Sequence, residues 1–363
     1  MPKYDSLNAI CPYFTMFPLS VPSKQLQEID SVKWILDPFC GRGTTNYAAR
    51  LLGLPSVGVD SSPIATAIAE GKLVDTVPEA IEKACLDILT SDLKVELPEG
   101  DFWKLCYHPS TLKNILLLRK ALLQDCSSPE RKALRALMLG ILHGPRNKGL
   151  PSYLSNQMPR TYAAKPNYAV RFWSKKQLKP IPVDIIELVS RKARYYFASR
   201  HPSVSFKVLC SDSRIFDFSA LGIKFAKVIT SPPYFGMRTY IPDQWLRYWF
   251  LGGPENVIYQ YPNQMTHSSS AEYAEQLSTI WSNIGRACSP GAKLMIRFGG
   301  IHVRKAKPKD IMLASLRETK HQFRLLTIRS AGLSSRGKRQ AEQFKRTLKS
   351  PIEEFDFYVR VEG

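Results

Sequence analysis

Apolar and polar positions alternate between short strand-like runs and helical repeats near the start of the chain. Val32–Asp37 is an apolar run that ends in a turn-rich segment, which predicts a buried strand. Thr45–Leu52 follows with helical spacing and ends before Gly53. Ser56–Asp60 predicts a second strand, and Pro63–Glu70 predicts a second helix. This order predicts the start of a doubly wound α/β sheet.

The middle of the chain loses this pattern and returns to it later. Helical spacing predicts helices at Leu112–Gln124, Arg131–His143 and Val183–Arg200, whereas residues 145–182 are rich in Pro and Tyr and have no regular period. The α/β pattern then resumes, with a helix predicted around Tyr273–Cys288 and strands predicted at Ser205–Ser211, Phe225–Thr230, Lys293–Phe298 and Phe355–Val361. We therefore expect one sheet domain, residues 1–75 and 205–363, interrupted by a mostly helical insert, residues 76–204.

Charge changes this picture because it is segregated along the chain. The net charge is +20, and residues 119–200 carry 17 Lys/Arg against 4 Asp/Glu. Residues 301–350 carry 14 against 3, which leaves a small negative charge on the remainder. Two basic blocks on a near-neutral body predict binding to a polyanion, with ordinary surface lysine as the alternative. A membrane surface is disfavoured because prolines break up these blocks.

Cysteine usage and the lengths of apolar runs exclude other classes. The seven cysteines are odd in number and form no CxxC pair, which predicts neither a disulfide framework nor a metal site. A reducing cytoplasmic location is expected. The first residues lack the basic and apolar regions of a signal peptide, and no apolar run approaches the length of a membrane span, so no membrane partner is expected.

The first candidate binding loop lies between the first predicted strand and helix. Gly41 and Gly43 flank one residue there, and glycines let the backbone approach a ligand closely. A dinucleotide fingerprint would require Gly or Ala at position 46, where the chain has Asn46. Asp60 ends the next strand, where a carboxylate can accept both ribose hydroxyls of a nucleoside. The alternatives are a structural turn and, for Asp60, a helix N-cap before Pro63.

The second candidate is Ser231-Pro232-Pro233-Tyr234, directly after the strand predicted at Phe225–Thr230. Adjacent prolines lack N–H donors, so this turn is expected to offer carbonyl acceptors without competing donors. Ser231 adds a hydroxyl acceptor, and Tyr234 adds a flat ring able to stack on a base. Ligands bind at the carboxyl ends of strands in open α/β sheets, which favours a site here over a purely structural turn.

These motifs resemble those of a known family. Asp37–Thr45 (DPFCGRGTT), Gly58–Pro63 (GVDSSP) and the SPPY turn look like the motifs of the DNA amino-methyltransferases, which use S-adenosylmethionine. The resemblance covers residues 11–72 and 205–300 well and the insert only in part. It implies a Rossmann-like class I methyltransferase sheet with a helical insert, in a bacterial or archaeal cytoplasm near the nucleoid. The family usually places its recognition domain elsewhere in the chain.

The resemblance also implies a reaction. The site-specific transfer of a methyl group from S-adenosylmethionine to the N4 amino group of a flipped-out cytosine is expected, because Ser at the first motif position is typical of that type. Asp or Asn there is commoner for N6-adenine, which remains an alternative, as does an RNA base amino-methyltransferase. A 5-methylcytosine enzyme is disfavoured because no Pro-Cys dipeptide occurs. Two further alternatives account for fewer of these motifs. They are a nucleic-acid-binding protein without catalytic activity and an NAD-linked oxidoreductase.

The resemblance further implies roles for individual residues. Phe39 and the glycine loop would pack against the cofactor, Thr44 or Thr45 at the helix start would meet its carboxylate, and Asp212 would lie near its adenine amino group. The N-terminal segment with Tyr13 would close over it. The catalytic candidates are Ser231, Pro232, Pro233 and Tyr234. The cofactor candidates are Tyr13, Thr15, Asp37, Pro38, Phe39, Gly41, Gly43, Thr44, Thr45, Asp60, Ser61, Asp212 and Ser213.

Double-stranded DNA is the expected partner, and the insert holds suitable side chains. Basic residues interleaved with aromatics and amides suit contacts to phosphates and bases. By contrast, the helical spacing of Trp245, Tyr248 and Trp249 favours a core role. The resemblance to the family also suggests a cognate restriction endonuclease as a further partner. The sequence does not predict the oligomeric state. The DNA-binding candidates are Arg146, Lys148, Asn156, Arg160, Arg171, Lys175, Arg238, Arg304, Arg336, Lys338 and Arg339.

Overall fold

The computed structural model of the chain describes residues 6–13, 17–27, 29, 33–147, 149–155, 158–236, 241–259, 264–299, 307–333 and 353–362. The chain divides into two compact units. We call residues 1–13, 67–201 and 240–261 the helical unit, and residues 14–66, 202–239 and 262–363 the sheet unit. The predicted insert falls almost entirely in the helical unit, which also takes in residues 1–13, 67–75 and 240–261 from outside it.

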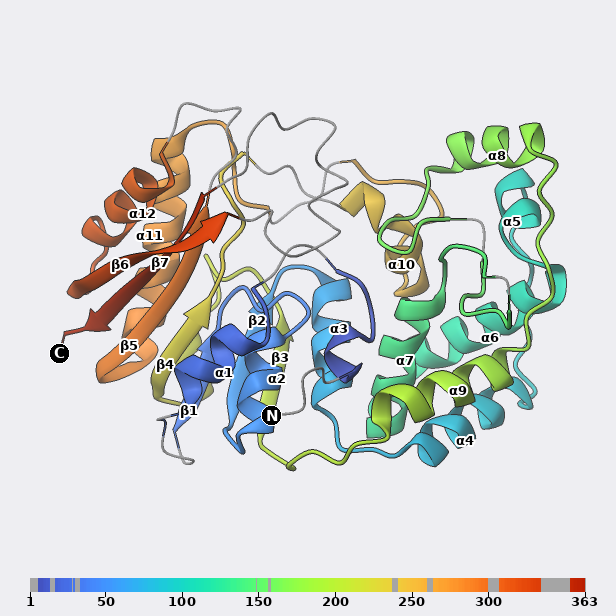
Figure 1. Cartoon of the computed structure of the whole chain (residues 1–363), viewed down its shortest axis with the longest axis horizontal. Helices are drawn as coiled ribbons and strands as arrows, with labels where there is room; N and C mark the ends of the chain where they lie inside the picture. The colour runs from blue at the N-terminus through green and yellow to red at the C-terminus, as the bar shows by residue number, and fades with distance from the viewer. Residues whose placement is uncertain are drawn as a thin grey trace. The chain divides into compact units, whose positions relative to one another are not determined.

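The sheet unit contains all the strands of the described chain (Figure 1). The strands are β1 (Trp34–Asp37), β2 (Ser56–Asp60), β3 (Phe206–Cys210), β4 (Phe225–Thr230), β5 (Cys288–Gly299), β6 (Phe323–Leu333) and β7 (Glu353–Val361). Its helices are α1 (Ser20–Leu26), α2 (Thr44–Leu51), the 3₁₀ turn η2 (Phe218–Leu221), α11 (Ser270–Ala287) and α12 (Pro308–Arg317). The boundary between the units falls within α3 (Pro63–Leu73).

The helical unit holds the remaining elements. They are η1 (Ser6–Ala9), α4 (Pro78–Leu89), α5 (Asp101–Cys106), α6 (Pro109–Gln124), α7 (Pro129–Ile141), α8 (Pro166–Lys175), α9 (Ile185–Phe197), η3 (Ile241–Asp243) and α10 (Trp245–Phe250). Among the helices in the described ranges, none has the length and apolar character needed to cross a membrane.

The strands form one seven-stranded sheet in the order β3-β2-β1-β4-β5-β7-β6. Strands β1 to β5 pair in parallel, whereas β7 runs antiparallel to both of its neighbours. The predicted doubly wound α/β sheet is therefore confirmed, with β2 and β4 at the predicted residues. Strand β6 was not predicted, because polar residues such as Arg324, Thr327 and Arg329 interrupt its apolar pattern at the sheet edge.

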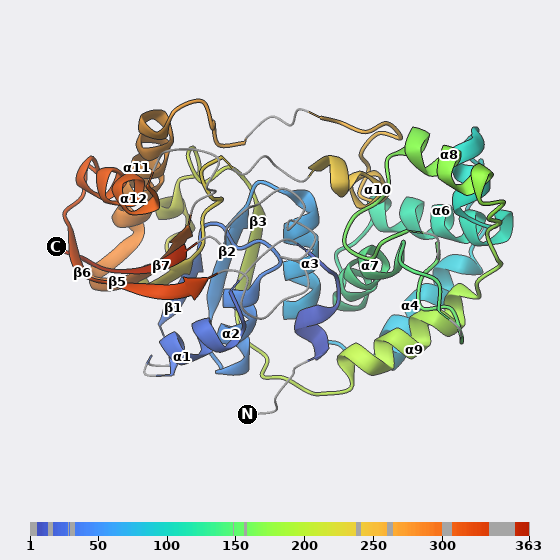
Figure 2. The same ribbon diagram turned by 45° about the horizontal axis from the view of Figure 1, so that its top comes forward.

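Successive residues of the central strands point to opposite faces of the sheet, as strand geometry requires. Leu36 and Val228 belong to a buried cluster with α11 and α12, whereas the adjacent Ile35 and Ile229 belong to a second cluster with α1 and α2. Figures 1 and 2 show these two helix pairs on opposite sides of the sheet. Because both faces are covered, the central strands read as nearly continuous apolar runs.

Aromatic side chains fill the core of the helical unit. Phe102 contacts Trp245 with ring centroids 4.9 Å apart, and Trp103 contacts Trp249 at 4.5 Å. Trp245 and Trp249 are 2% and 1% exposed, so their predicted core role is confirmed. The predicted helices of this unit are present as α6, α7 and α9, whereas α8 lies in the stretch where no period was recognised. It is short and buries only two side chains, Ala169 and Trp173, which is too few to show a repeat.

Candidate active site

The sheet brings the ends of four strands together at one edge. Strand β1 lies between β2 and β4, and β3 flanks β2, all in parallel. Parallel strands present their carboxyl ends at the same edge, so the segments that follow them meet there. The glycine loop, Asp60, Ser211–Arg214 and the SPPY turn are therefore neighbours, although they are far apart in the sequence.

The glycine loop is built around Asp60. Gly41 and Gly43 have φ values of 50° and 70°, which glycine adopts without strain. The backbone N–H of Gly41 donates to Asp60 Oδ2 at 2.9 Å, and that of Ser62 donates to Oδ1 at 2.9 Å. The second bond closes a turn just before α3. The N-cap role considered for Asp60 falls instead to Ser62, whose Oγ accepts the N–H of Ala65 at 3.4 Å. A carboxylate has about four acceptor positions, which leaves room for two ribose hydroxyls.

Asp37, at the end of β1, lies too deep to face a ligand. Its side chain is 2% exposed, the hydroxyl of Thr230 donates to Oδ1 at 2.7 Å, and the N–H of Phe39 donates to the same oxygen at 3.1 Å. Burial raises the pKa of Asp37 to about 6, against the opposing effect of hydrogen bonds from Thr230, Thr45 and Phe39. Asp37 therefore acts as a support that joins the ends of β1 and β4.

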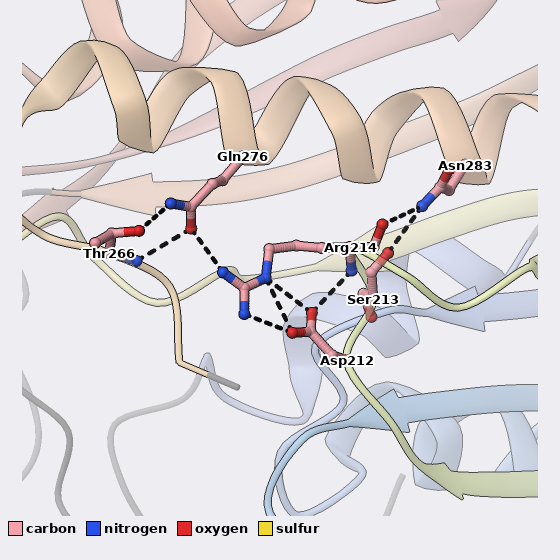
Figure 3. A network of polar contacts seen from close by, with 6 residues as sticks. All are labelled: Asp212, Ser213, Arg214, Thr266, Gln276 and Asn283. Atoms are coloured by element: carbon pink, nitrogen blue, oxygen red, sulfur yellow. Dashed lines mark hydrogen bonds and ion pairs between the residues drawn. The ribbon is translucent and has the colours of Figure 1, made fainter. Parts of the chain in front are cut away.

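Arg214 donates hydrogen bonds to both oxygens of the Asp212 carboxylate (Figure 3). Oδ1 accepts from Arg214 N at 2.9 Å and Nε at 3.0 Å, and Oδ2 accepts from Nε at 3.0 Å and from a terminal guanidinium nitrogen at 2.5 Å. Arg214 in turn donates to Gln276 on α11 at 3.1 Å. Only three N–H groups are involved, because the single Nε–H is shared between the two oxygens, so Asp212 keeps some acceptor capacity and its contact to adenine stays a prediction.

One carbonyl of the proline turn already accepts a hydrogen bond from another part of the sheet unit. The hydroxyl of Tyr273, on α11, donates to the carbonyl oxygen of Pro233. The expectation of acceptors without competing donors is therefore wrong for Pro233, because a donor arrives from another element. No described residue donates to the carbonyl of Pro232. Just beyond the turn, the N–H of Gly236 donates to His267 Nδ1 at 3.2 Å, which anchors the end of the loop.

Tyr234 is packed into the sheet unit rather than displayed on its surface. Its side chain is 8% exposed, and its ring meets Phe298 edge to face with centroids 5.8 Å apart. Its hydroxyl donates to Glu354 Oε1, on β7, at 2.7 Å. Burial, with the adjacent Glu354 carboxylate, raises the pKa of Tyr234 well above its ordinary value. Stacking of the whole ring on a base would require the ring to move.

The other predicted cofactor residues fall into three groups. Thr44, Thr45, Pro38 and Ser213 are buried supports, since the Thr45 hydroxyl donates to the Ile229 carbonyl at 3.2 Å and the Ser213 hydroxyl donates to the Pro38 carbonyl at 2.6 Å. Phe39 and Ser61 are half-buried in the sheet unit. Tyr13 belongs to the helical unit. Several predicted residues lie outside the described part of the chain: Thr15, Lys148, Asn156, Arg238, Arg304, Arg336, Lys338 and Arg339.

The described DNA-binding candidates are all exposed and belong to the helical unit. Arg171 and Lys175 lie on α8, where Tyr168 and Phe172 stack with centroids 6.2 Å apart and are 65% and 42% exposed. Arg146 and Arg160 lie in the segments between α7 and α8. The outer face of α8 therefore combines positive charge with open aromatic surface. In the described ranges, no cluster of three or more His, Cys, Asp and Glu residues is placed to hold a metal ion.

Sequence reasoning missed the residues that surround these motifs. Thr230, Tyr273, Arg214 and Glu354 each contact a predicted residue, yet none belongs to a motif. Only Thr230 and Arg214 carried a signal, because each is within two positions of a motif residue. Tyr273 and Glu354 come from elements later in the chain, and their contacts depend on the fold.

Comparisons with known proteins find sequence similarity over a limited length. No protein-family model matches the chain. A segment of 72 residues is 38% identical to the type II methyltransferase M.MjaII of Methanocaldococcus jannaschii, but it amounts to 19% of this chain and 14% of that protein. This chain therefore matches only a small part of its curated relative.

Solved structures align over most of the chain at low identity. The rRNA methyltransferase aviRa of Streptomyces viridochromogenes is 12% identical, with a TM-score of 0.36 over 99% of this chain and 93% of that chain. A SAM-dependent methyltransferase of Methanosarcina mazei is 10% identical, with a TM-score of 0.33 over 96% and 99%. Similarities this distant identify neither a substrate nor a reaction.

The buried carboxyl of Asp37 predicts a pH-dependent stability. Its pKa rises from 3.8 to about 6 on folding, so the folded chain binds more protons than the unfolded chain between these values. The stability that Asp37 contributes is therefore lost as pH rises through this window, by about 3 kcal/mol in total. Asp37→Asn, which mimics the protonated acid, removes this loss. Urea unfolding of both proteins at pH 4.5 and pH 7.5 measures about 2 kcal/mol of this loss, and parallel pH dependence would contradict the assignment.

Proposed function

We propose that this chain is an S-adenosylmethionine-dependent methyltransferase that modifies the N4 amino group of a cytosine in DNA. One observation carries the proposal: a glycine loop bonded to the half-buried Asp60 and an SPPY turn share one edge of the sheet unit. A nucleoside site and an amine-binding turn are the two parts that such a reaction needs. The similarity of a short segment to a type II methyltransferase supports the same conclusion.

The residues around Asp60 fit the proposed cofactor. The glycine loop has no side chains at Gly41 and Gly43, and Asp60 retains acceptor positions for ribose hydroxyls. Phe39 is half-buried beside the loop and offers an apolar contact. Bound S-adenosylmethionine would supply an electrophilic methyl group to the target nitrogen.

The SPPY turn would prepare the amine. The Ser231 hydroxyl and the Pro232 carbonyl would each accept one N–H of the amino group, which concentrates the nitrogen lone pair on the side facing the methyl carbon. The turn would hold the amine so that its nitrogen takes up the methyl group that S-adenosylmethionine would supply, and the methylated nitrogen would release one proton to water. Positioning and charge stabilisation supply the acceleration.

The basic surface of the helical unit supports a nucleic acid as the substrate. Residues 119–200 hold 17 Lys/Arg, and the α8 face adds exposed rings beside Arg171 and Lys175. A base inside a duplex must leave the stack before its amino group can react, which costs a few kcal/mol. Phosphate contacts from such a surface would offset that cost.

One assay separates the proposed reaction from its alternatives. The protein is incubated with labelled S-adenosylmethionine and either duplex DNA or total RNA, and the modified nucleoside is identified by mass spectrometry. N4-methylcytosine in DNA supports the proposal. N6-methyladenine in DNA would overturn the choice of base, and methylation of RNA alone would overturn the choice of DNA.

Ser231→Ala tests the catalytic turn. Loss of one acceptor to the amine is expected to lower kcat by about tenfold to a hundredfold, with little change in the melting temperature, because Ser231 is only half-buried. Tyr234→Ala is a poorer test, since removal of a ring that is 8% exposed would leave a cavity costing about 3 kcal/mol or more.

The matched control for Ser231→Ala is Ser219→Ala, which removes an exposed hydroxyl from η2 in the same unit. Its kcat should equal that of the wild type. Equal turnover in Ser231→Ala and Ser219→Ala would remove Ser231 from the catalytic assignment.

Charge reversal on α8 tests the DNA surface. Arg171→Glu and Lys175→Glu should each weaken duplex binding and lower the slope of log affinity against log salt by about 1, because each removes one phosphate contact. Fluorescence anisotropy across a salt series measures both effects. Lys94→Glu, an exposed lysine outside the basic block, is the control. Slopes that match this control in both variants would exclude α8 from the interface.

A further inference from the structure

Two neighbouring rings on α8 are open to solvent. Tyr168 and Phe172 are four residues apart, which places them on the same side of the helix. They are 65% and 42% exposed, their ring planes differ by 11°, and their centroids lie 6.2 Å apart. Phe172 has no polar side-chain atom that water can hydrate, so its exposure is unfavourable. The two aligned rings therefore present an apolar surface that a flat ligand would cover favourably.

The same side of α8 carries two cations. Successive residues of an α-helix are rotated by about 100°, so Arg171, Lys175, Tyr168 and Phe172 fall within an arc of about 100°. Among the described residues, no carboxylate lies within ion-pair distance of Arg171 or Lys175. Residues 131–183 contain 11 Lys/Arg and no Asp or Glu. The charge around the rings therefore favours an anionic ligand.

The opposite side of α8 is fixed in the core of the helical unit. Ala169 and Trp173 are each 1% exposed, and the Trp173 ring lies against Phe102 with centroids 5.6 Å apart. Figure 1 shows α8 beside α5 at the periphery of this unit. Because the buried side holds the helix in place, the exposed rings are already arranged before a ligand binds. Little conformational entropy is then lost on binding.

A nucleotide combines the two properties that this surface requires, a flat aromatic base and a neighbouring negative charge. Stacking of bases on aromatic side chains is a main contribution to single-strand binding by proteins. A base inside a duplex is covered on both faces by its neighbours, so only an unpaired base has a face to offer. We propose that Tyr168 and Phe172 form a stacking platform for an unpaired base, with Arg171 and Lys175 contacting the adjacent phosphates.

The inference rests on the proposed nucleic-acid substrate and is independent of the reaction and of the target base. It gives the α8 face a preference that charge alone does not provide. Arg171 and Lys175 attract paired and unpaired strands, because phosphates are present in both. The rings add affinity only where a base is unstacked. The platform therefore favours single-stranded or locally opened nucleic acid over a continuous duplex.

Tyr168→Leu and Phe172→Leu test the platform, because leucine keeps an apolar side chain and a high helix propensity but has no aromatic face. Each should weaken binding of a single-stranded DNA oligonucleotide by about fivefold or more, and its effect on the matching duplex should be smaller. The slope of log affinity against log salt should stay unchanged, whereas Arg171→Glu should lower it. Fluorescence anisotropy across a salt series measures both quantities.

Two variants serve as controls for this measurement. Tyr168→Phe keeps the ring and should bind the single strand as tightly as the wild type. Tyr195→Leu removes a tyrosine on α9 that is also 65% exposed, and it should leave the affinity unchanged. Wild-type affinity in both Tyr168→Leu and Phe172→Leu, or losses no larger than that of Tyr195→Leu, would overturn the inference.

Competition separates recognition of bases from recognition of charge. An abasic strand of the same length carries the phosphates without the bases, and it should displace the labelled oligonucleotide at least about fivefold more weakly than the intact strand. Equal displacement by the abasic strand would show that phosphates alone are recognised and would refute the platform. Equal displacement by polyglutamate would identify the surface as a site for acidic peptides and would also refute it.

Photocrosslinking locates the base without any need for activity. A single-stranded oligonucleotide that carries 5-iodouracil is irradiated in complex with the protein, and the modified peptide is identified by mass spectrometry. A crosslink at Tyr168 or Phe172 supports the inference, and crosslinks only at other residues would exclude it. If the wild type crosslinks there but methylates no nucleic acid, the proposed function fails while the platform stands. If it methylates DNA but crosslinks only elsewhere, the platform alone fails.

Discussion

A hydrogen bond from the Thr230 hydroxyl to the buried carboxylate of Asp37 joins the ends of two neighbouring strands, and the candidate site depends on it. Asp37 directly precedes the glycine loop, and Thr230 directly precedes the SPPY turn. Burial of a carboxyl group is costly unless hydrogen bonds compensate it. Thr230 and the N–H of Phe39 provide that compensation, so the two loops are held in register by the same group.

Competition for acceptors defines what remains available to a ligand. Asp212 accepts three N–H groups of Arg214, the Pro233 carbonyl accepts the Tyr273 hydroxyl, and the Tyr234 hydroxyl donates to Glu354. Asp60 keeps acceptor capacity, and Ser231 keeps lone pairs. Fewer groups are therefore available to a ligand than the sequence motifs suggest. Residues that seem to be ligand contacts in the sequence are partly the scaffold that orients the others.

The helical unit has a comparable internal constraint. Arg247 is fully buried, and its guanidinium donates to the Leu139 carbonyl at 2.8 Å and to the Arg160 carbonyl at 2.9 Å. It also donates to the side chain of Gln244. A buried arginine satisfied by carbonyl oxygens ties α7 and α10 to the irregular segment before α8. Together with backbone hydrogen bonds such as that from the Gly144 N–H to the Ser155 carbonyl at 2.8 Å, the arginine gives this segment a defined path.

The sequence by itself determined the sheet class, the strands β2 and β4, and the places where chemistry would gather. Local patterns were enough, because strand periodicity, turn residues and motif spacing act over a few neighbouring positions. Only the tertiary structure decided which of those residues are buried and hydrogen-bonded within the fold. Asp37 and Thr45 turned out to be supports, and Glu354 and Tyr273 turned out to be neighbours of the motif. Hydrogen bonds between residues 40 to 193 positions apart follow from strand order and packing, which leave no local signature.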